Sequence, residues 1–224
     1  MRFRTQIALS ALAMLGGIVS VGPANATPSL CGTTAGNLVQ NCGFELDSST
    51  TSVNVAPIDW TLTSAKQSPD FFLNPASPPA AIGAHSGTGF AAFGAFGDEP
   101  DEISQSISTV AGHRYDISFY VSPSGLVPAD FAAKFGSDTL LTQVNPSGVN
   151  DPANGNYELE NFVVTATSAS TLLAFFGFDD SAFVGLDDIS VTDLGAAAVP
   201  EPASLALVAA GLVGLGLARR RKAQ

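Results

Sequence analysis

Apolar and polar residues alternate along much of this chain, and that alternation constrains the fold more than any other feature. Between residues 115 and 121 every second residue has a large apolar side chain, as in a strand with one buried face. The run 172–178 is apolar on both faces, which is typical of a strand between two packed sheets. No stretch between residues 27 and 198 sustains a helical period. The sequence therefore predicts an all-β domain.

The central region of about 170 residues is long enough for one domain with a full hydrophobic core. Strands are expected at residues 37–41, 58–63, 70–74, 90–96, 103–110, 115–121, 131–142, 162–166, 172–178 and 183–191. The segment 131–142 is expected to be a hairpin that turns at Gly136-Ser137-Asp138. Because Pro- and Gly-rich loops separate about nine strands, we expect a β-sandwich, with the jelly roll as the favoured topology.

The N-terminus has the three parts of a secretory signal peptide. A basic start is followed by an apolar run at 7–21 and by the small-x-small site Ala24-Asn25-Ala26. A membrane span would need about 20 apolar residues, and Pro23 interrupts the run too soon. We therefore expect cleavage after Ala26, with residues 1–26 as a signal helix; the alternative is a buried N-terminal helix of the fold.

The C-terminus combines a short motif, an apolar run and a basic end. Pro200, Glu201 and Pro202 precede the apolar run 203–218, and Arg219, Arg220 and Arg221 follow it. The run is short for a membrane helix but sufficient when the basic residues reach the headgroups. The basic end is expected to stay cytoplasmic, which leaves everything before Pro200 outside.

This order of elements is similar to the PEP-CTERM sorting signal of Gram-negative bacteria that make exopolysaccharide. The resemblance implies recognition by an exosortase, which would remove the tail near the motif. The protein would then be exported, held transiently in the inner membrane, and released to the cell surface or beyond. An ordinary single-span anchor is the alternative. The expected division of the chain is signal peptide 1–26, β-sandwich 27–198 and sorting signal 199–224.

The expected mature domain is strongly acidic. Six of the nine basic residues lie in the two terminal signals, which leaves three against 19 acidic residues and a net charge near −16. Phosphate backbones and anionic membrane surfaces would be repelled, so nucleic-acid binding is excluded. Cations, including Ca²⁺, would be attracted.

Cys31 and Cys42 follow shortly after the expected cleavage site. In an oxidising, exported setting this even pair predicts one disulfide. Closing so short a loop stabilises a domain by about 2–3 kcal/mol. Zinc is not expected, because it would need more Cys or His nearby and only His85 and His113 exist.

Six short motifs occur in the order found in galactose-binding-like jelly rolls, which include several families of carbohydrate-binding modules. They are the opening N-L-V-Q-N-C-G-F-E at 37–45, Trp60, the turn at 85–89, the Ser/Gln strand at 103–107, G-H-R-Y at 112–115 and G-L-D-D-I-S-V at 185–191. The resemblance covers residues 37–192. Cys42 replaces the usual first Gly of the opening motif, which agrees with a disulfide particular to this lineage.

The resemblance also implies a structural calcium site. In such jelly rolls the Glu of the opening motif and the first Asp of the closing motif often hold Ca²⁺, which here implies Glu45 and Asp187, with backbone oxygens near Ser86 and Gly87. Hard oxygen ligands suit Ca²⁺, and a cation offsets the repulsion between two carboxylates. The alternative is that both acids are solvated. By strand alternation Asp188 is expected to point away from Asp187.

Sugar-binding sites in such modules combine an aromatic platform with polar groups. Tyr120 and Tyr157 are the expected surface candidates, since Tyr120 alternates away from the core positions around it. Trp60 is the third candidate, although the family pattern usually places this Trp in the core.

Catalysis is not expected. The chain has no Gly-x-Ser-x-Gly elbow, Ser86 beside His85 is a turn pair, and the carboxylates at 98–102 lie in a charged loop. The leading hypothesis is an exported, exosortase-processed, non-catalytic surface or matrix protein that binds extracellular polysaccharide. The alternatives are a secreted glycan-active hydrolase and a purely structural adhesion or biofilm protein. A shallow sheet face bearing Tyr120 would favour binding, and a deep acidic cleft would favour catalysis.

Overall fold

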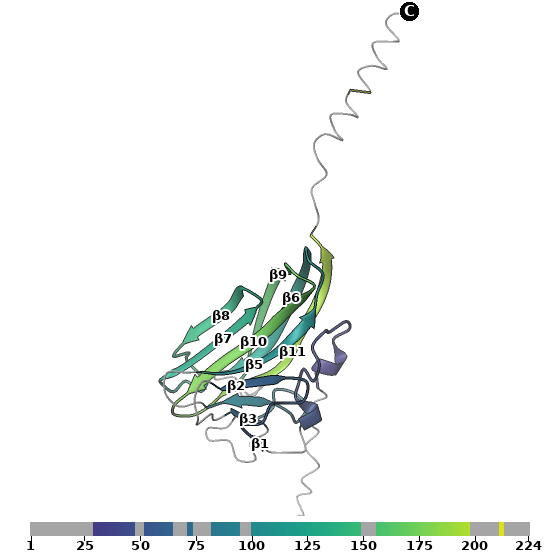
Figure 1. Ribbon diagram of the computed structural model, residues 1–224. Coiled ribbons are helices and arrows are strands. Elements are labelled where there is room, and N and C mark those ends of the chain that lie inside the picture. Colours follow the sequence, from purple (N-terminus) through teal and green to yellow (C-terminus); the bar gives the residue numbers. More distant parts are fainter. Residues whose placement is uncertain are drawn as a thin grey trace, which may run out of the picture.

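The computed structural model describes residues 29–47, 52–64, 71–73, 82–94, 100–148, 156–197 and 211–212. They form two antiparallel sheets packed face to face, with two short 3₁₀ helices, η1 (Cys31–Thr33) and η2 (Glu45–Asp47), beside them (Figure 1). The six-stranded sheet has the order β1 (Ser52–Val53), β3 (Phe71–Leu73), β4 (Ala91–Phe93), β11 (Val184–Ala196), β6 (His113–Ser122) and β9 (Glu158–Thr165). The five-stranded sheet has the order β2 (Thr61–Ser64), β5 (Asp101–Ser108), β10 (Ser170–Asp179), β7 (Ala129–Phe135) and β8 (Asp138–Val144).

The pairing of the strands confirms the predicted jelly roll. β7 and β8 form a hairpin, and the pairs β6–β9, β5–β10 and β4–β11 follow outward from it along the chain. These pairs are distributed over the two sheets, as when one long hairpin folds over on itself. The first and last strands of this set, β4 and β11, therefore lie side by side in the six-stranded sheet.

The core lies between the sheets and is filled mainly by aromatic and branched side chains. Phe119 of β6 contacts Phe175 of β10 edge to face, with ring centroids 5.0 Å apart. Phe131 of β7 completes this group, and all three side chains are almost fully buried. The alternation predicted for 115–121 is confirmed, because Tyr115, Ile117, Phe119 and Val121 all face the core. The two-faced burial predicted for 172–178 holds for part of β10: Ala174 and Phe178 on its outer face are buried, whereas Leu172 on the same face is 46% exposed.

One expectation about strands is wrong, and one strand is additional to those expected. Residues 37–41 form no strand: the Asn37 Oδ1 accepts the backbone N–H of Val39 (3.1 Å) and that of Val191 (3.0 Å), so the side chain ties a loop to β11. β1 was not predicted. The hairpin at 131–142 is confirmed, with its turn between β7 and β8.

The terminal signals lie outside the described residues, except for the helical pair Gly211 and Leu212 in the run 203–218. Among the residues that the structure describes, no helix is long and apolar enough to cross a membrane.

Candidate functional site

A bulge in β11 brings the side chains of Asp187 and Asp188 to the same turn of the chain. Asp187 pairs with Tyr120 of β6, but the next regular pair is Ser190 with Ser118, so the register shifts between them. Asp188 has a φ of +48°, in the left-handed region. Both carboxylates are buried, Asp187 completely, and both bind Ser86. The expectation that Asp188 points away from Asp187 is therefore wrong, because the bulge interrupts the alternation.

Asp187 binds the start of the turn at 85–89. Its Oδ2 accepts the backbone N–H of His85 (2.8 Å) and of Ser86 (3.2 Å), and its Oδ1 accepts the N–H of Asp188 (2.7 Å). Burial raises the pKa of Asp187 well above its usual range, and the neighbouring charge of Asp188 raises it further. The three backbone hydrogen bonds act in the opposite direction, because they favour the charged form.

Asp188 connects β11 with two other segments of the chain. Its Oδ1 accepts the hydroxyl of Ser86 (2.8 Å) and the backbone N–H of Cys31 (3.2 Å), while its Oδ2 lies 2.8 Å from the His85 Nδ1. The Ser86 hydroxyl in turn accepts the N–H of Leu30 (2.9 Å). His85 and Ser86 thus bind the same acid at its two oxygens, an arrangement that fixes the turn rather than activating the serine.

Glu45 binds the end of the same turn. Its Oε1 accepts the backbone N–H of Thr88 (2.8 Å) and of Gly89 (3.0 Å), and its Oε2 accepts the Thr88 hydroxyl (3.0 Å). Gly89 lies so close to the chain at Gly43 and Phe44 that a Cβ there would come within 2.5 Å of backbone atoms. The turn is therefore held between Glu45 at one end and Asp187 at the other.

The residues predicted to bind calcium are thus gathered around one turn. Their carboxylates suit a hard cation, and each already accepts hydrogen bonds from the turn or from the neighbouring backbone. The described residues contain no group of three or more His, Cys, Asp or Glu side chains placed to hold a metal. The predicted set has two carboxylates with backbone oxygens, so calcium at Glu45 and Asp187 stays a prediction.

Two of the three aromatic candidates are buried. Trp60 is 6% exposed, packs against Phe44 with centroids 5.8 Å apart, and donates its Nε1–H to the Asn41 carbonyl (3.4 Å). The surface position predicted for Tyr157 is wrong, since this side chain is 3% exposed. It lies over Gly185 of β11, where a Cβ would come within 2.8 Å of the Tyr157 hydroxyl oxygen. The glycine leaves the space that the ring fills.

Tyr120 is half-buried and lines a groove of about 220 Å³ on the outer face of the six-stranded sheet. Its ring stacks on that of His85, with centroids 3.6 Å apart and an interplanar angle of 18°. Ser118, Ser190 and Asn161 line it from β6, β11 and β9 with hydroxyl and amide side chains, and Asp188 also lines it, with a side chain that is only 2% exposed. No Lys or Arg is among the lining residues. We call this the Tyr120 groove.

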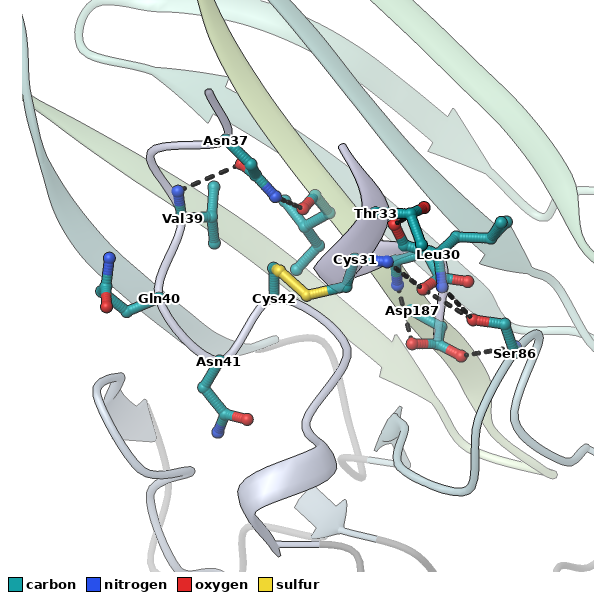
Figure 2. The surroundings of a disulfide bond; sticks show 12 residues. Leu30, Cys31, Thr33, Asn37, Val39, Gln40, Asn41, Cys42, Ser86 and Asp187 are labelled. Atoms are coloured by element: carbon teal, nitrogen blue, oxygen red, sulfur yellow. Dashed lines mark hydrogen bonds between the residues drawn. A yellow bond between two sulfur atoms is a disulfide. The ribbon is translucent and has the colours of Figure 1, made fainter. Parts of the chain in front are cut away.

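The segment from Leu30 to Thr34 forms one wall of the Tyr120 groove. The predicted disulfide is confirmed: Cys31 of η1 is joined to Cys42, with Cα atoms 5.5 Å apart. Figure 2 shows the disulfide beside Asp187 and Ser86, with Leu30 and Cys31 above them. His85, Asp188 and this wall were missed as parts of one site, because only their meeting in space reveals it.

A smaller hollow of about 170 Å³ lies on the five-stranded sheet, next to Phe176 and Thr142. The half-buried Phe176 alternates with the core residue Phe175, so its ring belongs to the outer face of this sheet. The Lys134 ammonium lies over that ring, 5.1 Å from its centroid. None of the residues expected to bind a ligand lies in this hollow.

Comparison with solved structures gives similar chains of low sequence identity. They include TmCBM61 in complex with β-1,4-galactotriose (17% identity, 70% of this chain and 98% of that chain, TM-score 0.47). The C-terminal family 22 carbohydrate-binding module of Clostridium thermocellum Xyn10B has 14% identity, with 74% and 99% of the chains covered and a TM-score of 0.48. The enzymatically active domain of bacteriophage CBA120 tailspike protein 4 has 10% identity, 71% and 22% coverage and a TM-score of 0.48.

No curated protein matches the chain. The family model for the PEP-CTERM protein-sorting motif matches residues 198–222, in agreement with the predicted sorting signal. This motif indicates an exported protein that is sorted by an exosortase.

Proposed function

We propose that the domain binds extracellular polysaccharide in the Tyr120 groove, as a non-catalytic protein of the cell surface or matrix. The observation that carries the proposal is an aromatic ring beside hydroxyl and amide groups in one shallow groove. Sites for small polar ligands combine apolar or aromatic surface with a few placed polar groups. Stacking on His85 holds the Tyr120 ring in one orientation, so less freedom is lost on binding.

The size and charge of the groove suggest the kind of chain that it binds. At about 220 Å³ it is smaller than typical small-molecule pockets of roughly 300–1,000 Å³. It therefore suits part of a long chain lying across the sheet. Its lining has no Lys or Arg to pair with an acidic sugar, so neutral or amino sugars fit better than uronic acids.

Hydrolysis is the weaker candidate. Glycoside hydrolases commonly use a pair of carboxylates on either side of the scissile bond. Asp188 is the one carboxylate among the residues that line the Tyr120 groove. Its oxygens already contact Ser86, Cys31 and His85. This arrangement supports binding without catalysis.

The test is binding of the secreted protein to a panel of neutral, amino and acidic polysaccharides, followed by variants. Replacing Tyr120 by Ala should weaken binding at least tenfold, whereas Tyr120→Phe keeps the ring and should bind nearly as well as wild type. Phe176→Ala is the control on the opposite sheet. Loss of binding in Phe176→Ala but not in Tyr120→Ala would place the site on the five-stranded sheet. Absence of binding to every polysaccharide would favour the purely structural alternative.

A further inference from the structure

The wall of the Tyr120 groove at residues 30–34 has little packing of its own. None of the residues of η1 is buried, and Leu30 is 42% exposed. Cys31 is the residue of η1 that packs against the main core. The position of this wall therefore depends on specific bonds more than on hydrophobic burial.

Those bonds are the disulfide and two backbone hydrogen bonds. Leu30 N–H donates to the Ser86 hydroxyl and Cys31 N–H to the Asp188 carboxylate. At the far end, the Asn37 amide donates to the Ile189 carbonyl and fixes the following loop to β11. Two hydrogen bonds are a weak restraint on a half-exposed segment, because water replaces them when they open.

The other half of the disulfide is firmly placed. Cys42 is buried in the main core, and its carbonyl accepts the N–H of Ile189 (2.9 Å). Ile189 and Asp188 belong to the part of β11 that lines the groove. The disulfide therefore connects the wall directly to the floor of the groove.

We infer that the Cys31–Cys42 disulfide positions this wall, so that the groove acquires its binding shape only in the oxidised protein. This inference rests on the proposed function. Two thiols lose two electrons and two protons, which pass to a disulfide oxidant by thiol–disulfide exchange. Disulfides form in oxidising compartments, whereas cysteine thiols stay reduced in the cytosol. The chain that carries the sorting motif thus becomes able to bind polysaccharide after export, and its reduced precursor lacks the wall.

The experiment compares the oxidised protein with the double variant Cys31→Ser/Cys42→Ala, using the polysaccharide that wild type binds best. Alanine at position 42 avoids a buried, unpaired hydroxyl. Leu173→Ala is the matched control, because it removes packing from β10 in the core and leaves the wall and its disulfide intact. Affinity, melting temperature and hydrogen exchange of residues 30–34 are measured for each protein.

The double variant should bind at least tenfold more weakly than wild type, and residues 30–34 should lose their protection while β6 and β10 keep theirs. Wild type treated with a dithiol reductant should behave in the same way. The control should melt lower but bind like wild type. If wild type and the double variant bind equally, or if residues 30–34 stay protected, the inference is wrong and the proposed function stands. If wild type binds no polysaccharide, both are wrong.

Discussion

Gly89 tests whether the turn at 85–89 is held as tightly as its contacts indicate. In Gly89→Ala the new Cβ would lie 2.5 Å from the Gly43 carbonyl oxygen and from the Phe44 backbone. Backbone atoms cannot rotate away as a side chain can, so the turn itself has to move. Both Thr88 N–H and Gly89 N–H would then move away from Glu45.

The expected cost has two parts. Overpacking in a close contact costs about 1–3 kcal/mol. Each of the two hydrogen bonds to the half-buried Glu45 adds about 0.5–1.5 kcal/mol, since water partly replaces it. The free energy of unfolding should therefore fall by about 2–6 kcal/mol. For a domain of this size each kcal/mol lowers the melting temperature by about 2–4 °C, which gives a decrease of roughly 4–24 °C.

Gly83→Ala is the matched control, because nothing lies within 4 Å of a Cβ at that position. Its free energy of unfolding should change by no more than about 0.5 kcal/mol. Both variants are compared with wild type by urea unfolding, with equal m-values as the sign of an unchanged unfolding reaction. Equal midpoints for Gly89→Ala and Gly83→Ala would show that the turn does not lie against residues 43–44 as described.

Three further predictions concern calcium, pH and the chain ends. If Ca²⁺ binds at Glu45 and Asp187, a hundredfold excess over its Kd stabilises the fold by about 2.7 kcal/mol. The melting temperature should then rise with Ca²⁺, and Glu45→Gln and Asp187→Asn should each reduce that rise. Equal melting temperatures of wild type in Ca²⁺ and in chelator would exclude the site. The hydrogen bond from His113, with that from Gly195 N–H, lowers the pKa of the exposed Asp193. Because the folded pKa lies below the unfolded one, this contribution to stability is present above the unfolded pKa and is lost as the pH falls through the folded pKa. Asp193→Asn should therefore reduce the fall of stability in acid, and identical pH profiles of variant and wild type would contradict this. In the native host the extracellular protein should lack residues 1–26 and the tail after the sorting motif; an intact mass that includes residues 203–224 would contradict exosortase processing.

The strands were predictable where side-chain alternation decides which face is buried. From 103 to 191 the period of two, together with Pro- and Gly-rich loops, located β5 to β11 to within a few residues. The segment 37–41 was misjudged because its apolar pattern resembles a strand. There the Asn37 side chain takes the hydrogen bonds of Val39 and Val191, and Asn41 has a φ of +47°.

The site was less predictable, because it depends on a bulge and on a missing side chain. One extra residue in β11 brings the Asp188 side chain to the same site as the Asp187 side chain. The sequence Asp187-Asp188 gives no sign of that register shift. Tyr157 is buried because Gly185 on another strand leaves room for it. Both features arise between segments far apart in the sequence, whereas alternation is a local signal.

The place of β11 in the sheet has a consequence for the order of synthesis, export and folding. β11 is the last strand in the described part of the chain, yet it lies between β4 and β6. Until β11 pairs, β4 and β6 lack the strand that connects them. Pairing between strands far apart in the sequence makes folding slow. The six-stranded sheet therefore cannot close until the chain has been made as far as β11. β11 ends at Ala196 and the sorting motif begins at residue 198, so the last stretch needed for folding leads directly into the stretch that an exosortase reads.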